Sequence, residues 1–362
     1  MTVQSPFEIE DALPGPSVDL TPEKIEFGRI FVPSWLSCEF RDGAWQRTRI
    51  GRMTNIEAHP AAVVFHYGQA IFEGMKAYRW DNGSINLFRP YENARRFNRS
   101  AGRMIMPEMD EENFVEGIRA LVDRQRDWVP RYPGSLYVRP TMIATEPCIG
   151  VRGAHQFLYY VITLPSGAYF AQIAGKAGAG AVGVYVTTTV GRACHGGTGA
   201  VKAAENYAVT LQIIGEGKKQ GCAQVLFLDA EGHRNIEEMG GMNVFFVSGK
   251  TLYTPRLNDT ILGGITRDSI VKLAPMHGYT VQETVVNFDD LVSRIRKGEV
   301  TEAFACGTAA VIAGIGRFKI DTGEEITIGD GKAGPVTEEL YDRLSGIQYG
   351  RYSDPSNWIV RV

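Results

Sequence analysis

The chain has 362 residues, more than one hydrophobic core usually organises, so we expect two domains. Hydrophobic residues make up 44% of it, and no uninterrupted apolar run reaches the roughly 18 residues of a membrane-spanning helix. A net charge of −3 gives no reason to expect nucleic acid or an anionic membrane as a partner.

The first residues are acidic and lack the apolar core of a secretory signal, so we expect a cytoplasmic protein. Five scattered cysteines include no C-x-x-C pair, and six histidines include no H-E-x-x-H pattern. The sequence therefore predicts free thiols in a reducing compartment and no metal site.

The first half of the chain mixes strand and helix patterns. Residues 61–67 and 85–90 have the β-branched and aromatic content of strands, and Asp81-Asn82-Gly83 indicates a hairpin turn within 73–88. Apolar residues repeat at helical spacing over 91–104 and 111–129. Residues 135–145 and 155–165 have the composition of central strands.

Small residues fill positions 171–183, which is typical of a mobile connector. We therefore expect an N-terminal domain over 1–170 and a C-terminal domain over 184–362. The second half opens with a strand pattern at 182–190, and a helix is predicted over 206–221, ending at Gly221. Strands follow within 223–255, then a helix over 265–278 and strands around 280–286 and 302–315.

Two glycine-rich stretches imitate nucleotide-binding motifs. "GAGAVG" at 178–183 matches G-x-G-x-x-G, but a strand pattern follows it where the dinucleotide motif requires a helix. "GGTGAVKAA" resembles a phosphate loop, but its lysine neither follows a glycine nor precedes a serine or threonine. Neither stretch predicts nucleotide binding.

Lys202 stands in the second stretch, between alanines and a valine. By itself it is most simply a surface lysine, because lysine is almost never fully buried. The alternative is that the small neighbours make room for a cofactor ring against a reactive amine, which would need burial or a cationic neighbour to lose its proton.

"GGTGAVKAAENYAVTLQ" (196–212) resembles the lysine segment of the branched-chain amino acid aminotransferases, fold-type IV enzymes that use pyridoxal phosphate. The resemblance continues in order through most of the chain beyond about residue 25. It is carried by "HYGQAIFEGMKAYR" (66–79), "LFRPYENARRFNRSAGRM" (87–104), "LYVRPTMIATEPCIGV" (136–151), "LPSGAYF" (164–170), "NIEEMGGMNVFFV" (235–247), "LGGITRDSI" (262–270) and "ACGTAAVI" (305–312).

The resemblance implies roles for the cofactor site. Lys202 would form the Schiff base and move the proton between the substrate Cα and the cofactor, and Tyr207 would meet the ring oxygen. Glu238 would face the pyridine nitrogen and favour its protonated form. Strand alternation alone leaves Glu237 and Glu238 equally open, and two solvated glutamates remain the alternative.

The resemblance also implies phosphate contacts. Arg96 would bind the phosphate, although a solvated arginine on a helix is an open alternative. Ile265 and Thr266 would open a helix whose N–H groups bind the anion, with Thr266 otherwise a plain N-cap. The turn at Thr308 and Ala309 would offer N–H groups to phosphate and substrate carboxylate.

The substrate pocket that the resemblance implies is aromatic. Tyr137 and Arg139 would help to receive the distal carboxylate of glutamate, since the guanidinium matches carboxylate geometry. A structural arginine in a central strand is the alternative for Arg139. The remaining pocket residues would be Tyr67, Phe72 and Tyr169, with Thr308 and Ala309 at the substrate carboxylate.

Two departures from the family are visible. Ala204-Glu205 replaces a common glycine pair, and residue-level reasoning gives Glu205 no role. The C-x-x-C that some members carry after "GTA" is absent. We do not expect redox control of that kind.

The expected architecture is mixed α and β (α+β), with a smaller N-terminal α/β domain and a larger C-terminal domain whose core resembles a β-barrel. The expected reaction is reversible transamination between leucine, isoleucine or valine and 2-oxoglutarate by a pyridoxal phosphate enzyme. We expect a homodimer, with a partner loop over the site. Alternatives are a D-amino acid aminotransferase or aminodeoxychorismate lyase on the same scaffold, and a non-catalytic metabolite-binding protein.

Overall fold

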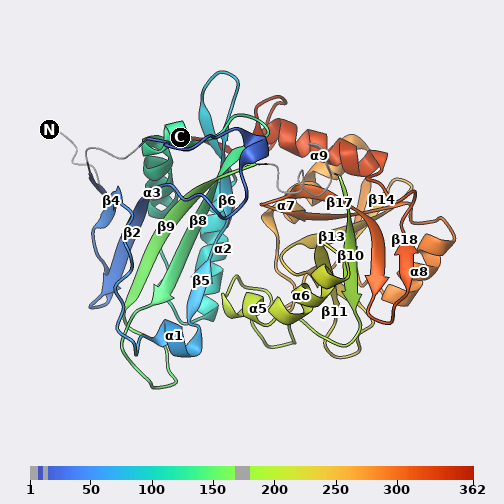
Figure 1. Cartoon of the computed structure of the whole chain (residues 1–362), viewed down its shortest axis with the longest axis horizontal. Helices are drawn as coiled ribbons and strands as arrows, with labels where there is room; N and C mark the ends of the chain where they lie inside the picture. Colours follow the sequence, from blue (N-terminus) through green and yellow to red (C-terminus); the bar gives the residue numbers. More distant parts are fainter. Residues whose placement is uncertain (1–6, 11–14, 168–179) are drawn as a thin grey trace. The chain divides into compact units, whose positions relative to one another are not determined.

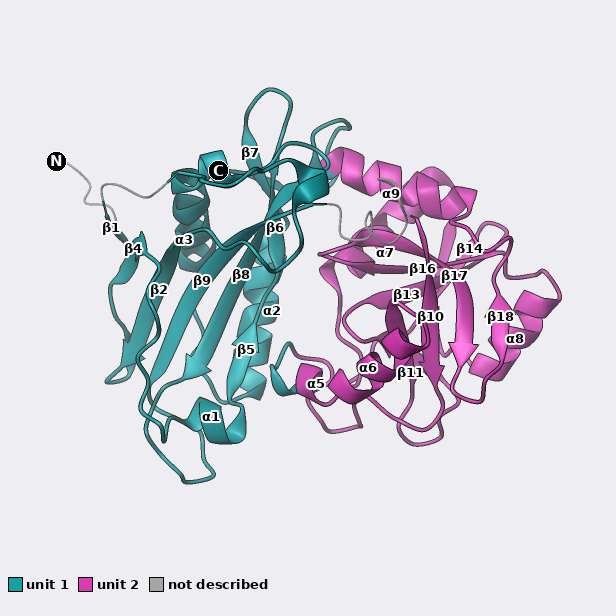
Figure 2. Cartoon of the chain, in the orientation of Figure 1, with its two compact units in different colours: residues 1–168, 202–205, 348–362 teal, residues 169–201, 206–347 magenta. Residues whose placement is uncertain are grey.

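The computed structural model describes residues 7–10, 15–167 and 180–362, which form two compact units (Figures 1 and 2). Unit 1 comprises residues up to 168, then 202–205 and 348–362, and unit 2 comprises 169–201 and 206–347. Most of the expected connector at 171–183 lies outside the described residues, although a strand begins inside it at Ala181. The domain boundaries therefore stay a prediction.

Unit 1 is built on a mostly antiparallel sheet. Among the described residues its ten strands run in the order β1-β4-β2-β9-β8-β6-β7-β19, with β3 beside β2 and β5 beside β8. The strands are β1 (Phe7–Ile9), β2 (Ser34–Arg41), β3 (Ala44–Trp45), β4 (Thr48–Arg52), β5 (Ala70–Phe72), β6 (Met75–Arg79), β7 (Ile85–Phe88), β8 (Ser135–Ala144), β9 (Phe157–Ser166) and β19 (Ile359–Arg361).

The predicted hairpin and both predicted central strands of this unit are confirmed. Strands β6 and β7 pair antiparallel, with Ala77 opposite Leu87, and Gly83 takes a positive φ of 83° in their turn. Strands β8 and β9 pair along their whole length, from Ser135 opposite Ser166 to Ala144 opposite Phe157.

Two helices cover one face of the sheet, α2 (Pro90–Arg103) and α3 (Glu111–Arg124). Their apolar sides form one core with the strands, and Phe97 of α2 and Phe114 of α3 pack ring to ring at 5.3 Å between centroids. Asp110 caps α3 by accepting the Asn113 N–H at 2.9 Å. The second helix is shorter than predicted, because a 3₁₀ turn, η2 (Arg126–Trp128), replaces its last turn.

The prediction of a strand over 61–67 is wrong, since Val63–Tyr67 form the short helix α1. Gly68 takes the left-handed conformation at φ 64°, and its N–H donates to the Val64 carbonyl, which closes a helical turn. Here a local cap outweighs the strand preference of the valines and aromatics. A second 3₁₀ turn, η1 (Pro22–Lys24), lies between β1 and β2.

Unit 2 has its own curled sheet and its own core. Among the described residues nine strands run in the order β12-β11-β10-β17-β16-β13-β14-β15, with β18 beside β17. They are β10 (Ala181–Thr187), β11 (Gln224–Leu228), β12 (Ile236–Met239), β13 (Asn243–Ser248), β14 (Thr251–Pro255), β15 (Thr280–Thr284), β16 (Glu302–Gly307), β17 (Val311–Ile320) and β18 (Glu325–Thr327).

The helix predicted over 206–221 is two helices. Thr210 lies between them, and its hydroxyl donates to the Tyr207 carbonyl at 2.8 Å, a local bond that competes with helix continuation. Two further helices, α8 (Phe288–Arg296) and α9 (Pro335–Gln348), were not predicted. The helices after the connector are α5 (Glu205–Ala208), α6 (Leu211–Lys219), α7 (Ile265–Leu273), α8 (Phe288–Arg296) and α9 (Pro335–Gln348), with the 3₁₀ turn η3 (Ala274–His277).

The sequence expectation of mixed α and β structure is confirmed in both units. The five cysteines all carry free thiols. Within the described ranges, no helix is long and apolar enough to cross a membrane.

Candidate active site

Lys202 lies on a short extended segment that pairs with β5 in unit 1. The Phe72 N–H donates to the Lys202 carbonyl at 3.1 Å, and the Ala204 N–H donates to the Ala70 carbonyl at 2.9 Å. The Lys202 N–H donates to the Ser100 hydroxyl on α2 at 3.0 Å. The lysine precedes α5, as predicted, and its half-buried side chain is not that of an ordinary surface lysine.

Around Lys202, the residues 202–205 belong to unit 1 although the chain on both sides belongs to unit 2. The lysine Nζ lies 4.9 Å from the centre of the Phe72 ring. Glu205 opens α5, where a carboxylate suits the positive end of the helix.

Arg96 is buried on α2, so a solvated role for it is excluded. Its Nε and Nη2 donate to the two oxygens of Glu73 at 2.6 and 2.9 Å. Sequence reasoning missed Glu73, and the signal available was its place in "IFEGMKAYR" between two strand patterns. The arginine expected to bind phosphate is thus hydrogen-bonded through two of its donors to a buried carboxylate.

Three of the predicted pocket residues lie together on the sheet of unit 1. The Arg139 Nη2 donates to the Tyr137 hydroxyl at 2.9 Å, and its guanidinium lies 4.5 Å from the centre of the Phe72 ring. Gly74 makes room for this cluster, because a Cβ there would collide with the Tyr137 hydroxyl. A cation stacked between aromatic rings is a suitable receptor for a carboxylate.

The structure does not bring Tyr67 into that cluster. It ends α1, is 40% exposed, and its hydroxyl donates to the Ile149 carbonyl at 2.7 Å. Tyr169 lies outside the described residues.

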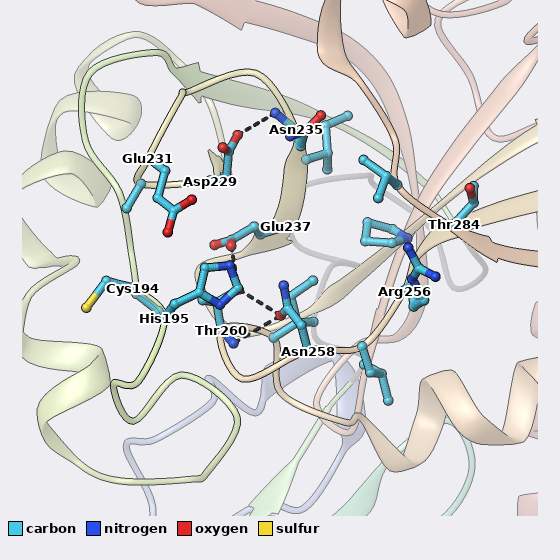
Figure 3. A pocket seen from close by; sticks show the side chains of 17 residues that line it. Cys194, His195, Asp229, Glu231, Asn235, Glu237, Arg256, Asn258, Thr260 and Thr284 are labelled. Atoms are coloured by element: carbon cyan, nitrogen blue, oxygen red, sulfur yellow. Dashed lines mark hydrogen bonds between the residues drawn. The ribbon is translucent and has the colours of Figure 1, made fainter.

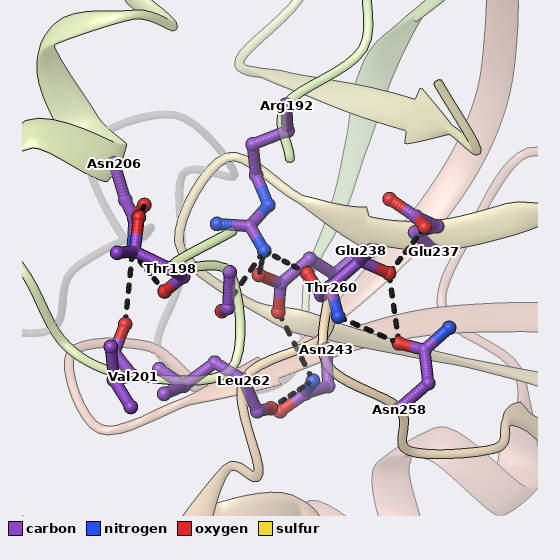
Figure 4. Close-up of polar contacts among 11 residues, drawn as sticks. Arg192, Thr198, Val201, Asn206, Glu237, Glu238, Asn243, Asn258, Thr260 and Leu262 are labelled. Atoms are coloured by element: carbon purple, nitrogen blue, oxygen red, sulfur yellow. Dashed lines mark hydrogen bonds and ion pairs between the residues drawn. The ribbon is translucent and has the colours of Figure 1, made fainter. Parts of the chain in front are cut away.

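In unit 2, Glu238 is buried on β12 and ion-paired with Arg192 at 2.6 Å (Figure 4). Asn243 Nδ2 donates to the same carboxylate at 3.4 Å and to the Leu262 carbonyl at 3.0 Å. Arg192 also donates to the carbonyls of Gly199, at 3.2 Å, and Thr260. Sequence reasoning missed Arg192, since nothing in "TVGRACHGG" indicates that its partner lies on β12.

Glu237 is buried too, on the other side of β12, so the alternative of two solvated glutamates is wrong. The Thr260 hydroxyl donates to Glu237 Oε1, and burial raises the pKa of the Glu237 carboxyl. Glu237 lines a separate cavity of about 270 Å³ together with His195, Asn258 and Arg256 (Figure 3). The two glutamates therefore have different surroundings, and Glu238 is the one held against a cation.

The segments expected to bind phosphate in unit 2 have the predicted conformations. Ile265 and Thr266 are the first residues of α7, and Gly264 is its N-cap, so Thr266 is not the cap. Thr308 and Ala309 lie in the turn between β16 and β17, which ends at Val311 with a positive φ of 63°. Helix starts and such turns direct backbone N–H groups at anions.

Comparison with known proteins identifies the family. The family model described as amino-transferase class IV matches residues 70–318. A relative from Mycolicibacterium smegmatis named branched-chain-amino-acid aminotransferase is 43% identical over 358 residues and covers 96% of either chain. The chain belongs to the branched-chain-amino-acid aminotransferase family. It is thus a class IV aminotransferase by family.

Solved structures agree with this family. A branched-chain amino acid aminotransferase from Escherichia coli has a TM-score of 0.74 at 27% identity, covering 89% of this chain and 98% of that one. A branched-chain amino acid aminotransferase from T.th., complexed with N-(5′-phosphopyridoxyl)-L-glutamate, has a TM-score of 0.71 at 27% identity, covering 89% and 97%. The fold-type IV architecture expected from the sequence is confirmed.

The predicted site residues of this aminotransferase divide between its units. Unit 1 holds Lys202, Arg96, Tyr67, Phe72, Tyr137 and Arg139, and unit 2 holds Tyr207, Glu238, Ile265, Thr266, Thr308 and Ala309. The donors fit pyridoxal phosphate chemically: a lysine amine, a buried carboxylate for the ring nitrogen, and a buried guanidinium and N–H groups for the phosphate.

Proposed function

We propose that this protein catalyses reversible amino transfer between leucine, isoleucine or valine and 2-oxoglutarate, giving the branched 2-oxo acids and L-glutamate. The observation that carries the proposal is the 43% identity over 96% of both chains with a named branched-chain-amino-acid aminotransferase. The solved neighbour that is complexed with a phosphopyridoxyl conjugate of glutamate supports pyridoxal 5′-phosphate as cofactor and glutamate as one substrate.

The proposal assigns the cofactor to Lys202, which tethers it, and to Arg96, Ile265, Thr266 and Thr308, which hold its phosphate. When bound, the cofactor supplies an electron-withdrawing ring and a carbon that exchanges amine for oxygen. Lys202 then takes and returns the proton at the substrate Cα.

Two further residues set the charge of the cofactor ring. Glu238 holds a proton on the pyridine nitrogen through its negative charge, and the Tyr207 hydroxyl meets the ring oxygen. The burial of Glu238 on a strand supports this role, because a carboxylate acts more strongly where water is excluded.

The proposal assigns substrate recognition to the aromatic cluster. Phe72 provides an apolar wall for branched side chains, and Tyr137 and Arg139 receive the distal carboxylate of glutamate. The Arg139–Tyr137 hydrogen bond supports this, since together with the contact of the guanidinium with the Phe72 ring it restricts the guanidinium before substrate arrives. The family resemblance alone adds Tyr67, which lies apart from this cluster, and Tyr169 to the wall. Thr308 and Ala309 offer N–H groups to the substrate carboxylate.

A homodimer in the cytoplasm, expected from the sequence, completes the proposal. Analytical ultracentrifugation of the holoenzyme tests the dimer: a sedimentation coefficient matching twice the chain mass is the expected result. A monomer that is fully active would contradict it.

The decisive experiment is Lys202→Ala. We expect this variant to lose covalently bound cofactor, read from its visible absorbance, and to lose leucine-dependent glutamate formation by at least about a hundredfold. Lys250→Ala, at an exposed lysine, is the control and should keep both properties. Covalent cofactor retained in Lys202→Ala refutes the role of the lysine.

Two measurements on the unmodified protein test the alternatives. A preference for D-alanine over L-leucine would support a D-amino acid aminotransferase instead. A protein with no visible chromophore after addition of pyridoxal 5′-phosphate would support a non-catalytic binding protein.

A further inference from the structure

The Glu73 carboxylate, in the link between β5 and β6, is fully buried and has four donors. Arg96 supplies two of them, through Nε at 2.6 Å and Nη2 at 2.9 Å. Asn93 Nδ2 donates at 2.7 Å and the Gly74 N–H at 3.0 Å. The Glu73 backbone is fixed as well, since its N–H donates to the Pro140 carbonyl at 2.8 Å.

This geometry determines the orientation of Arg96. A guanidinium is planar and carries its donors in a rigid fork, so two hydrogen bonds on its Nε–Nη2 edge fix both its plane and its rotation. Ser100 Oγ also donates to the Arg96 carbonyl at 3.0 Å, and the same hydroxyl accepts the Lys202 N–H. The arginine and the lysine segment therefore share one rigid support.

The charges around Glu73 are unequal. Burial alone would raise the pKa of its carboxyl, but the Arg96 guanidinium, then the Lys202 ammonium and the Asn93 amide, lower it. One carboxylate thus faces two cations inside unit 1. A buried ion pair is weak evidence for stability, because hydrophobic replacements are often as stable, so a positioning role is the more informative hypothesis.

We propose that Glu73 is a positioning residue that aims the Arg96 guanidinium at the phosphate group of the cofactor. The inference rests on the proposed function, in which Arg96 binds that phosphate. It opposes a simpler role in which Glu73 only neutralises Arg96. The two roles predict opposite signs: losing a positioning carboxylate weakens phosphate binding, whereas losing a neutralising one strengthens it.

The test compares two ligands that differ only in the phosphate. Cofactor-free wild type, Glu73→Gln and Glu73→Asp are titrated with pyridoxal 5′-phosphate and with pyridoxal, following visible absorbance. We expect Glu73→Gln to raise the Kd for pyridoxal 5′-phosphate about 10- to 100-fold, the effect of losing one charged hydrogen-bonding partner. The Kd for pyridoxal should change less than about threefold, and Glu73→Asp should fall in between.

Glu92→Gln is the matched control. Glu92 lies on the same helix, pairs with Arg95 at 2.9 Å at the surface and lies 3.8 Å from the guanidinium of Arg89, and neither pair includes Glu73 or Arg96. Both Kd values should equal those of wild type, because exposed ion pairs contribute little.

Several outcomes overturn the inference. Equal losses for both ligands, together with a lower Tm of the cofactor-free protein, would mean a structural role. Tighter binding of pyridoxal 5′-phosphate to Glu73→Gln would mean neutralisation. If Glu73→Gln does not fold, the same two-ligand comparison on Glu73→Asp decides, and no preferential loss for the phosphorylated ligand overturns the proposal.

The failure of this inference is distinguishable from failure of the proposed function. If wild type binds neither ligand, both the positioning role and the proposed function are refuted. The positioning role alone is refuted if wild type binds pyridoxal 5′-phosphate strongly and the Glu73 variants prefer it over pyridoxal by the same factor as wild type.

Discussion

Three arginines within one helical turn and a half of α2 have different surroundings. Arg95 and Arg99 are exposed, and Arg95 pairs with Glu92 and Glu111 at the surface. Arg96 is buried against Glu73. Helical spacing puts Arg96 beside Phe97, at the flank of the apolar stripe of α2. It does not decide whether the charge of Arg96 is solvated, because its partner Glu73 lies on another element.

Similar limits apply to the glutamate pair on β12. Alternation predicts that Glu237 and Glu238 point to opposite sides, and this holds. The distinction between them depends on Arg192, which lies far away in sequence. The periodicity of a short segment does not predict a contact with a residue so far away in the sequence.

Lys76 provides a residue-scale prediction about pH. It is buried on β6, and burial lowers the pKa of its ammonium from 10.5 to about 7. Between these values the unfolded chain binds a proton that the folded chain lacks, so this lysine makes stability rise with pH from about 7 toward 10.5. Lys76 destabilises the folded protein by its full amount below pH 7, and this destabilisation decreases as the pH rises.

We therefore expect Lys76→Met to remove a slope of up to about 1.4 kcal/mol per pH unit in the free energy of unfolding. Urea denaturation at pH 7 and pH 9 measures it. Lys250→Met, at an exposed lysine, should leave the slope unchanged. An unaltered slope in Lys76→Met would show that the lysine stays protonated in the folded chain.

At the scale of elements, local sequence signals predicted interiors better than ends. Helices α2 and α3 were predicted correctly because the apolar period persists over several turns. The strand expected at 61–67 became α1, and the helix over 206–221 broke at Thr210. Both errors come from single hydrogen bonds and caps that outweigh propensity in short segments.

Helix α8 was missed although Asn287 caps it by accepting the Asp290 N–H at 3.1 Å. The apolar residues Phe288, Leu291, Val292 and Ile295 follow at helical spacing and are buried. This helix was therefore predictable from cap and period together.

The start of α9 carries a prediction at this scale. Glu302, buried on β16, accepts the N–H groups of Val336 at 3.1 Å and Thr337 at 2.8 Å, and also the Thr337 hydroxyl at 2.7 Å. Helix starts leave N–H groups without intrahelical partners, and a carboxylate also suits the helix dipole. The approach depends on Gly334, where a Cβ would collide with the Glu302 side chain.

We expect Glu302→Gln to lower the free energy of unfolding by about 1–3 kcal/mol, measured by urea denaturation. Glu338→Gln is the control, since it removes a carboxylate from the same helical turn without touching these three bonds. Equal effects of the two substitutions would show that general charge near the helix start matters, not the buried cap.

At the scale of the whole molecule, unit 1 is assembled from three separate parts of the chain. The length of the chain predicted more than one hydrophobic core, and each unit has a hydrophobic core of its own. The discontinuity could not be predicted, because β19 (Ile359–Arg361) pairs with β7 (Ile85–Phe88), which joins the last residues to a strand in the first third of the chain. Such pairings have no local signature.

The C-terminal segment should therefore stabilise unit 1. Trp358 is buried, stacks edge-on with Phe88 at 5.6 Å between ring centroids, and lies 5.1 Å from the guanidinium of Arg89. We expect Trp358→Ala to lower the free energy of unfolding by about 3–5 kcal/mol. Arg361→Ala, at an exposed position on the same segment, should change it by less than about 0.5 kcal/mol. Chemical denaturation of both variants measures this, and similar midpoints would contradict it.

The excursion of residues 202–205 into unit 1 has a mechanical consequence. Lys202 is held by backbone hydrogen bonds to β5 and α2, the same elements that carry Phe72 and Arg96. Lys202, Phe72 and Arg96 are thus all carried by unit 1, whereas Glu238 belongs to unit 2. A displacement of one unit against the other would leave the distances among Lys202, Phe72 and Arg96 unchanged. It would change the distances from Lys202 to residues of unit 2, Glu238 among them.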